Sequence, residues 1–292
     1  MNKIKKVCII GVGMIGGSIG LALKKETIAE KIIGIGRNPK KLENAKRLKA
    51  IDEWDIDLKS GLKDADIVFI AVPVGLIAGV AKKASCFMKK NAIITDAGSV
   101  KGFLTKKIER NIKKGIHFVG VHPIAGSENN GVENARPDLF KNAVCVVTPT
   151  ERTDKQAFNK IKKIWLRIGS RVFISSPEKH DKILAFSSHL PHLAAASLVS
   201  TFNVLNNKES LAEDFVGSGF LDTTRVASGS PEIWKDICSG NSIAILKALK
   251  SFRKSIESLE SNIRKKKWNV VFKNLDKAKN IRDRIKKVKR VM

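Results

Sequence analysis

Short apolar runs alternate with helical segments through the first 176 residues of the chain. Near-continuous runs that are rich in β-branched side chains and separated by helices are typical of a parallel sheet covered on both faces. The runs are Val7 to Ile10, Ile32 to Ile35, Ile67 to Val72, Ala92 to Thr95, Phe118 to Val121, Ala143 to Val147 and Val172 to Ile174. The alternation predicts an α/β domain with a doubly wound parallel sheet.

The pattern changes after Ser175-Ser176-Pro177, where β-branched runs give way to long helical segments. Two of these segments are His189 to Asn203 and Asn241 to Lys266. A chain of 292 residues can hold two domains, each with its own core. We therefore expect an α/β domain over residues 1–176 and an all-helical domain over residues 177–292.

Two apolar stripes at helical spacing mark the last part of the chain. The first is Ile245, Leu249, Phe252, Ile256, Leu259 and Ile263, and the second is Trp268, Val271, Leu275, Ala278, Ile281, Ile285 and Val288. A stripe of this kind needs a facing helix. Packing within the chain and packing against a second copy explain the stripes equally well. A small helical domain with this much apolar stripe nevertheless favours a homodimer that associates through it.

The composition predicts a soluble, cytoplasmic protein without a bound metal. No stretch approaches the roughly eighteen uninterrupted apolar residues of a spanning helix, so we expect no membrane association. Glycines interrupt the apolar start of the chain, which indicates a first strand and turn instead of a signal peptide. The cysteines form no CxxC pair, which argues against a zinc ribbon and a redox motif. They are Cys8, Cys86, Cys145 and Cys238.

The net charge of +27, from 55 basic and 28 acidic residues, is the largest departure from average composition. A basic surface attracts nucleic acid, anionic membranes or anionic small molecules, so the charge alone does not select a partner. The lysines are spread over most segments, and an aromatic content of 6% is poor material for stacking bases. We expect a solvated basic surface with no nucleic-acid partner, and a nucleic-acid-binding protein is the distant alternative.

The segment GVGMIG fits the GxGxxG pattern of a dinucleotide-binding turn in a Rossmann-type domain. It follows the first predicted strand and opens a helix, whose start supplies N–H groups and a positive dipole end. Gly11 permits the tight turn, Gly13 lets the backbone approach a pyrophosphate, and Gly16 allows close packing of the helix. The predicted cofactor-binding set also includes Met14, Ile15, Val72 and Pro73.

The residues after the second predicted strand bear on which dinucleotide is bound. An NAD site normally has a carboxylate about twenty residues beyond the last glycine of the turn, where it binds the ribose 2′-hydroxyl. Here that place is Gly36, followed by Arg37 and, further on, by Lys40 and Lys41. A cation in place of the acid suits a 2′-phosphate, so we expect NADP as the cofactor, with NAD as the alternative.

His122 follows an apolar run at the carboxyl edge of the predicted sheet, where crevices form in folds of this kind. Pro123 and Gly126 restrict and bend the backbone after it, so its ring should be held rigidly at a strand end. When a hydride leaves an alcohol carbon, the hydroxyl must lose its proton, and a neutral imidazole accepts that proton well near neutral pH. His122 is therefore the candidate general base.

Five segments resemble the prephenate dehydrogenase family, which includes arogenate and cyclohexadienyl dehydrogenases. They are GVGMIGGS, TDAGSVKG, HPIAGSE, SSHLPH and GFLDTTR, in this order and over most of the chain. The resemblance implies a dinucleotide domain followed by an all-helical dimerisation domain. It also implies the oxidative decarboxylation of prephenate, a small dicarboxylate, to 4-hydroxyphenylpyruvate in tyrosine biosynthesis.

The same resemblance implies roles for individual residues. His122 would accept the hydrogen bond of the ring hydroxyl, and Ser99 would help to orient that group. His192 and Arg225 would bind the substrate, since a guanidinium fork gives a carboxylate two charge-assisted hydrogen bonds. The family's other polar positions near the pocket are Glu128 and Asp181.

Structural interpretations of two of these residues stay open on sequence alone. Ser99 could cap a helix that begins near Val100. Arg225 could be the ion-pair partner of Asp222 or Asp214.

Alternative functions stay open as well. His189 and His192 could bind a metal together with Asp181, although these three residues lack a closed zinc signature. The chain could also be an arogenate dehydrogenase, or another Rossmann dehydrogenase of the β-hydroxyacid type with a catalytic lysine in its helical domain.

Overall fold

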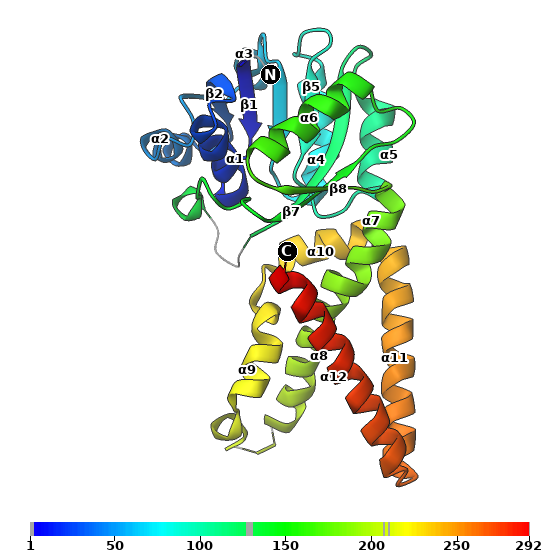
Figure 1. The fold of residues 1–292 in the computed structure, drawn as a ribbon. Coiled ribbons are helices and arrows are strands. Elements are labelled where there is room, and N and C mark those ends of the chain that lie inside the picture. The colour runs from blue at the N-terminus through cyan, green and yellow to red at the C-terminus, as the bar shows by residue number, and fades with distance from the viewer. Residues whose placement is uncertain (1–2, 127–130, 207, 210, 292) are drawn as a thin grey trace. The chain divides into compact units, whose positions relative to one another are not determined.

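The computed structural model describes residues 3–126, 131–206, 208–209 and 211–291. Eight strands form one sheet in the order β3-β2-β1-β4-β5-β6-β7-β8 (Figure 1). The strands are β1 (Ile4–Ile10), β2 (Ala29–Ile35), β3 (Glu53–Asp55), β4 (Ile67–Ile70), β5 (Ile93–Asp96), β6 (His117–Ile124), β7 (Val144–Thr148) and β8 (Arg171–Ile174). The strand order reverses between β1 and β4, which places a ligand crevice at the carboxyl ends of these two strands.

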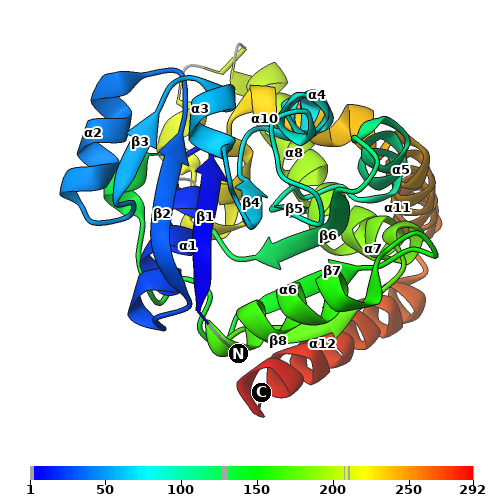
Figure 2. The ribbon, with the colours of Figure 1, turned by 90° about the horizontal axis from the view of Figure 1, so that it is seen from above.

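Helices cover both faces of the sheet, as Figure 2 shows from above. They are α1 (Met14–Lys25), α2 (Pro39–Arg47), α3 (Leu58–Leu62), α4 (Val74–Ser85), α5 (Gly102–Asn111) and α6 (Lys155–Arg167). On one face α1 and α6 bury Leu23 and Trp165, and on the other α4 and α5 bury Ile77 and Leu104. Because strand side chains alternate between the faces, each of the strands β1, β2, β4, β5 and β6 contributes to both cores.

Polar side chains determine where several helices begin. Five of them accept a hydrogen bond from the backbone N–H three residues ahead, and these are Asn38, Asp57, Asp154, Ser176 and Ser230. A cap of this kind stabilises a helix by about 1 kcal/mol. The Ser176 cap, followed by a proline whose fixed φ suits a first helical turn, starts α7 (Pro177–Leu184) directly after β8.

The sheet confirms the doubly wound α/β fold and corrects the prediction in two places. β3 is an edge strand of three residues, too short to show as an apolar run. β7 runs antiparallel to β6, and β8 follows β7 in parallel. Apolar runs do not report strand direction, which depends on the connection. Among its described residues the β6–β7 connection has the short 3₁₀-helix η1 (Val132–Asn134) and no crossover α-helix.

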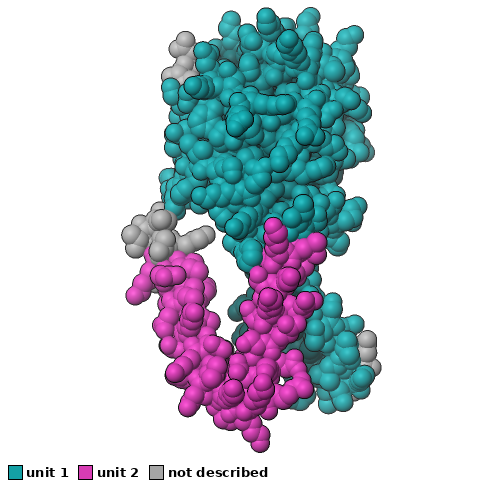
Figure 3. All heavy atoms as spheres, turned by 90° about the vertical axis from the view of Figure 1, so that its right-hand side faces the viewer, with its two compact units in different colours: residues 1–244 teal, residues 245–292 magenta. Residues whose placement is uncertain are grey.

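Residues 1–244 and 245–292 form two compact units, coloured separately in Figure 3. After β8 the first unit continues with further helical elements. These are α7, the π-helical turn η2 (Ala185–His189), α8 (Leu190–Asn206), η3 (Ala212–Phe215), α9 (Ser218–Thr224), η4 (Arg225–Ser228) and α10 (Pro231–Gly240). The second unit contains most of α11 (Ser242–Arg264) and all described residues of α12 (Trp268–Val291).

The two apolar stripes lie on α11 and α12, and most of their length is exposed. Phe252 and Ile256 on α11 are 38% and 49% exposed, and Leu275 and Ile285 on α12 are 60% and 50% exposed. Packing within the chain therefore leaves most of these side chains uncovered. Large apolar side chains exposed along two neighbouring helices in the sequence are typical of an interaction face.

One helical run in the described part of the chain, residues 177–206, is long and apolar enough to cross a membrane by length and composition. The sequence predicts no such segment, because the apolar residues of this run are interrupted by polar ones. The most apolar 18-residue window of this run has a mean hydropathy of 1.3, and 28% of it is buried. A single run of this kind is weak evidence for a membrane, since helices of soluble proteins share these properties.

Candidate active site

The glycine turn between β1 and α1 has the geometry that a dinucleotide site requires. Gly11 has a φ of +92°, and a Cβ atom there would lie 2.7 Å from the carbonyl oxygen of Ala71. A Cβ atom at Gly16 would lie 2.1 Å from the carbonyl oxygen of Gly11. At Gly13, which precedes α1, a Cβ atom would have no described atom within 4 Å. The backbone is thus open where a pyrophosphate would approach the helix N-terminus.

The segment after His122 lies beside this turn. A Cβ atom at Gly126 would lie 3.6 Å from Cε of Met14 and 3.9 Å from Cδ1 of Ile15, so the first residues of α1 face the end of the HPIAG stretch. On the other side, Val72 packs next to Gly11, and Pro73 stands at the start of α4. The fold therefore gathers the predicted cofactor residues of β1, α1 and β4 at one sheet edge.

Arg37 lies in the exposed turn between β2 and α2. The carboxylate nearest to this turn in the sheet is Asp55, because β3 pairs with β2 and places Asp55 opposite Ile35. Both oxygens of Asp55 are engaged in its own turn, where they accept the Asp57 N–H at 2.9 Å and the Ser60 hydroxyl at 2.5 Å. These bonds hold the Asp55 carboxylate within its own turn.

His122 lies inside β6, opposite Val146 of β7, and not at the strand end that the sequence indicates. The antiparallel partner extends β6 to Ile124, because it supplies hydrogen bonds beyond the parallel part of the sheet. The ring is buried, and its Nδ1 atom lies 2.8 Å from Nε2 of His180. Burial, together with His180, Lys101 and His189, holds the pKa of His122 well below 6.5. The imidazole is neutral at pH 7 and able to accept a proton.

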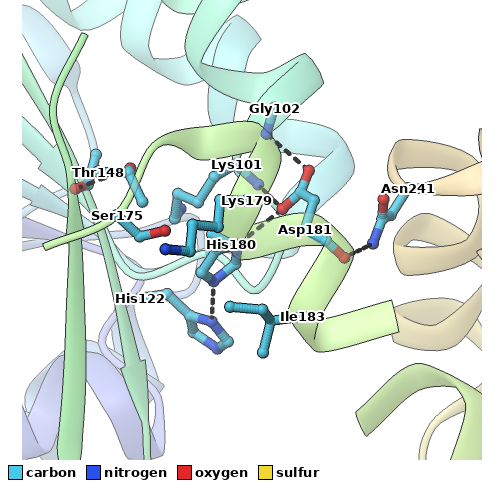
Figure 4. A network of polar contacts seen from close by, with 12 residues as sticks. Lys101, Gly102, His122, Thr148, Ser175, Lys179, His180, Asp181, Ile183 and Asn241 are labelled. Carbon is cyan, nitrogen blue, oxygen red and sulfur yellow. Dashed lines mark hydrogen bonds and ion pairs between the residues drawn. The ribbon is translucent and has the colours of Figure 1, made fainter. Parts of the chain in front are cut away.

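Asp181 joins α7 to the start of α5 (Figure 4). Its carboxylate accepts the backbone N–H groups of Lys101 and Gly102 at 2.8 and 2.7 Å, and it also contacts Nδ1 of His180 at 2.8 Å. These bonds satisfy the exposed donors of a helix N-terminus and place negative charge at its positive end. The predicted contact of Asp181 with substrate stays a prediction, and the structure gives this carboxylate three donors within the protein.

A second buried ion pair fixes the loop that contains Ser99. Nζ of Lys101 contacts Oδ2 of Asp96 at 2.5 Å, and both side chains are fully buried. Asp96 also accepts the N–H groups of Gly98 at 2.9 Å and Val121 at 3.2 Å, so it connects the loop to β6. Ser99 is half-buried between these anchors. It does not cap α5, which begins at Gly102 and is capped by Asp181.

His192 and Arg225 come from two elements that pack together, α8 and η4. The His192 ring is buried and stacks on Trp234, with ring centroids 3.5 Å apart. Burial lowers the pKa of His192, and a hydrogen bond with the backbone of Val226 opposes that shift. The Nδ1 atom of His192 is buried without a hydrogen-bond partner among the described residues. Arg225 is exposed at the C-terminal end of α9.

His189 has a structural environment of its own. Its Nδ1 atom lies 3.2 Å from Nδ2 of Asn241, which also donates to the backbone oxygen of Asp181 at 2.9 Å. Burial lowers the pKa of His189 to about 4. Within the described residues, no group of three His, Cys, Asp or Glu side chains is placed to hold a metal ion. Glu128 lies outside the described residues.

Sequence reasoning missed His180 and Lys101. His180 is 1% exposed and lies between His122 and Asp181, and Lys101 is fully buried. Both stand in segments already singled out, one next to Asp181 and the other within AGSVKG. The signal that could have identified His180 is its place next to Asp181, one turn after the proline that begins the helix. A lysine gives no sign of burial in a single sequence, because lysines are almost always exposed.

Comparisons with known proteins agree with this geometry. The family model described as "Prephenate dehydrogenase, nucleotide-binding domain" matches residues 19–174, and the model "Prephenate dehydrogenase, dimerization domain" matches residues 176–277. A prephenate dehydrogenase of Bacillus subtilis is 35% identical, over 97% of this chain and 77% of that protein. A cyclohexadienyl dehydrogenase of Zymomonas mobilis is 33% identical, over 90% of each.

Solved structures give the same result. The prephenate dehydrogenase of Aquifex aeolicus, in complex with hydroxyphenyl propionate and NAD+, is 34% identical with a TM-score of 0.92, covering 97% of this chain and 99% of that one. The Synechocystis arogenate dehydrogenase is 30% identical with a TM-score of 0.82, covering 96% and 99%. Because these matches extend over both domains of the family, the chain belongs to the prephenate dehydrogenase family.

Proposed function

We propose that the protein is an NAD(P)-dependent prephenate dehydrogenase of tyrosine biosynthesis, which converts prephenate to 4-hydroxyphenylpyruvate and CO2. One observation carries this proposal beyond family membership. The buried, neutral imidazole of His122 stands on β6. The residues that follow this strand lie beside the dinucleotide turn, where Gly126 faces Met14 and Ile15. This is the arrangement that an alcohol oxidation needs, with the proton acceptor and the hydride acceptor on neighbouring parts of one sheet edge.

His122 would act on the proton of the ring hydroxyl. A nicotinamide dinucleotide held at the turn of Gly11, Gly13 and Gly16 would supply the acceptor for the hydride that leaves C4 of the ring. As the hydride leaves, Nε2 of His122 takes up the hydroxyl proton and C4 becomes a carbonyl carbon. The bond from C1 to the ring carboxylate then breaks, its electron pair enters the ring, and CO2 departs. The resulting phenolate takes the proton back from His122, so the overall reaction releases no proton.

The remaining polar residues would hold the substrate. Ser99 would orient the hydroxyl from a loop that Asp96 and Lys101 keep fixed. Arg225 would bind a carboxylate of the substrate. His192, whose buried Nδ1 atom has no partner among the described residues, would also contact the substrate. The substrate contacts of Glu128 and Asp181 remain proposals from the family resemblance.

The reaction is tested by reduction of the cofactor at about 340 nm. We expect turnover with prephenate and either NADP or NAD, together with release of one CO2 per reduced cofactor. Arogenate in place of prephenate is the comparison to make, because an arogenate dehydrogenase is among the similar structures. Faster turnover of arogenate would move the assignment to that substrate, and no turnover with either compound would overturn the proposed function.

We infer further that NADP is the preferred cofactor. Gly36 supplies no carboxylate for a ribose 2′-hydroxyl, the oxygens of Asp55 accept hydrogen bonds in their own turn, and Arg37, which follows Gly36, is exposed. A guanidinium at this place favours a 2′-phosphate. NAD+ is the nucleotide in the A. aeolicus complex, so the two proteins would differ in preference.

Arg37→Asp should reverse this preference. A charge-assisted hydrogen bond contributes about 1.5–3 kcal/mol, so kcat/KM with NADP should fall by about 10- to 100-fold, while kcat/KM with NAD should hold or rise. Arg47→Asp is the matched control, because Arg47 is an exposed arginine at the end of α2, bonded to Asn44. An unchanged NADP-to-NAD ratio in the Arg37 variant would contradict the inferred phosphate contact.

We also propose a soluble, cytoplasmic homodimer divided into a dinucleotide domain (1–176) and a helical domain (177–292). The match to a dimerization domain over residues 176–277 supports association through the helical part. The exposed apolar stripes of α11 and α12 supply a surface that a second copy would cover. No nucleic-acid partner and no membrane enter this proposal.

A further inference from the structure

The carboxylate of Asp181 begins a chain of hydrogen bonds whose directions follow one from another. It accepts the backbone N–H groups of Lys101 and Gly102 at the start of α5. Each of its two oxygens thus already accepts an N–H group, so the carboxylate acts only as an acceptor here. Nδ1 of His180, 2.8 Å from Oδ1 of Asp181, must therefore be the donor.

The second link joins two imidazoles. A neutral imidazole has one donor and one acceptor nitrogen, so Nε2 of His180 becomes an acceptor once its Nδ1 donates. Nδ1 of His122 lies 2.8 Å from that acceptor and must therefore carry a hydrogen. The lone pair of His122 is then on Nε2, and Figure 4 shows this second nitrogen on the side of the ring away from His180.

We propose that His180 is a positioning residue of the reaction, which, with Asp181, holds His122 in the Nδ1–H tautomer and shares the positive charge that His122 acquires. This inference rests on the proposed function. When Nε2 of His122 takes the hydroxyl proton, the Nδ1 proton moves towards Nε2 of His180, and the charge comes to lie nearer to Asp181. When the phenolate takes its proton back, the Nδ1 proton returns to His122.

Burial explains why this chain of hydrogen bonds matters for the charge on His122. The side chains of His122, His180 and Asp181 are 9%, 1% and 6% exposed, so a positive charge on His122 alone would be poorly solvated. Lys101 adds no uncompensated charge, because it pairs with the buried Asp96. The remaining titratable neighbour is His189, which is bonded to Asn241. Asp181 is thus the anion that balances a proton held by the two histidines.

The tautomer of His122 can be measured without turnover. The chain has five histidines, so ¹⁵N–¹H correlation spectra of histidine-labelled protein contain five ring systems, and the spectrum of His122→Asn identifies the one from His122. We expect a protonated Nδ1 and an unprotonated Nε2 for His122 at neutral pH. In His180→Leu, which removes the acceptor, we expect a mixture of the two tautomers.

The kinetic test compares two substitutions at one position. His180→Leu leaves His122 without its acceptor and should lower kcat by about 10- to 100-fold, the range seen when an orienting partner is lost, with KM nearly unchanged. His180→Gln keeps an oxygen acceptor near the place of Nε2 and should recover part of this loss.

His117→Leu is the matched control, since His117 lies on the same strand, at its start, and half-buried. It should leave kcat and the His122 spectrum unchanged. An Nε2–H tautomer in the unsubstituted protein, or a wild-type kcat in His180→Leu, would overturn the proposal. If His180→Leu does not fold, the His122 tautomer in the unsubstituted protein and the kcat of His180→Gln test the proposal. A protein that turns over neither prephenate nor arogenate would instead overturn the proposed function.

Discussion

His122→Asn should lower kcat by about 10²- to 10⁴-fold, the usual contribution of a general base, while KM for the substrate stays nearly unchanged. Asparagine places an amide near Nδ1 of the imidazole, so the contact with His180 is retained and β6 keeps its structure. The nitrogen that would accept the hydroxyl proton is lost. Initial-rate kinetics with prephenate, and titration of substrate into the variant, separate turnover from binding.

The pH profile gives the same prediction a second test. The pKa of His122 is held well below 6.5, so its ring is unprotonated and active at neutral pH. As the pH falls through that lowered pKa, the ring gains a proton and can no longer accept one, so kcat should be flat near pH 7 and decline only in acid. His122→Asn should lack this decline, and His117→Asn should keep it. A His122 variant with full activity would exclude this residue as the base.

Lys101→Met should lower the free energy of unfolding by about 3–5 kcal/mol, because breaking a buried ion pair leaves an uncompensated charge. Lys101 and Asp96 are both fully buried, and the variant leaves Asp96 with only the backbone N–H groups of Gly98 and Val121. Denaturant unfolding followed by tryptophan fluorescence measures the loss, since Trp165 lies buried in the core of this domain.

Lys106→Met, on the helix that begins directly after Lys101, is the matched control. Lys106 pairs with Glu178 at 2.8 Å, but the two side chains are 63% and 58% exposed, so this variant should cost at most about 1 kcal/mol. The double variant Lys101→Met/Asp96→Leu removes both charges and should recover much of the lost stability. Equal losses in Lys101→Met and Lys106→Met would contradict the importance of the buried pair.

The fold was largely predictable because its information is local. Each predicted run corresponds to a strand, and the glycine turn falls between β1 and α1. Strand direction could not be predicted in this way, because the apolar pattern of β7 is the same whether the strand lies parallel or antiparallel to β6. The edge strand β3 was missed because its three residues, Glu53–Asp55, contain no apolar run.

Local sequence was enough to predict the dinucleotide turn and the candidate base. The turn depends on steric demands at neighbouring positions, such as the positive φ of Gly11 and the close approach at Gly16, which only glycine satisfies. His122 could be singled out because an imidazole next to such a turn suits a hydride transfer, and the family resemblance supports the same role.

Only the tertiary structure decided what holds His122 in place. His180 is 58 residues from His122 in sequence, and Asp181 is 80 residues from Lys101, yet hydrogen bonds join both pairs. No local rule relates positions so far apart, because they meet only after α7 has packed against the start of α5. The direction of each hydrogen bond, and with it the nitrogen of His122 that can accept a proton, follows from that packing.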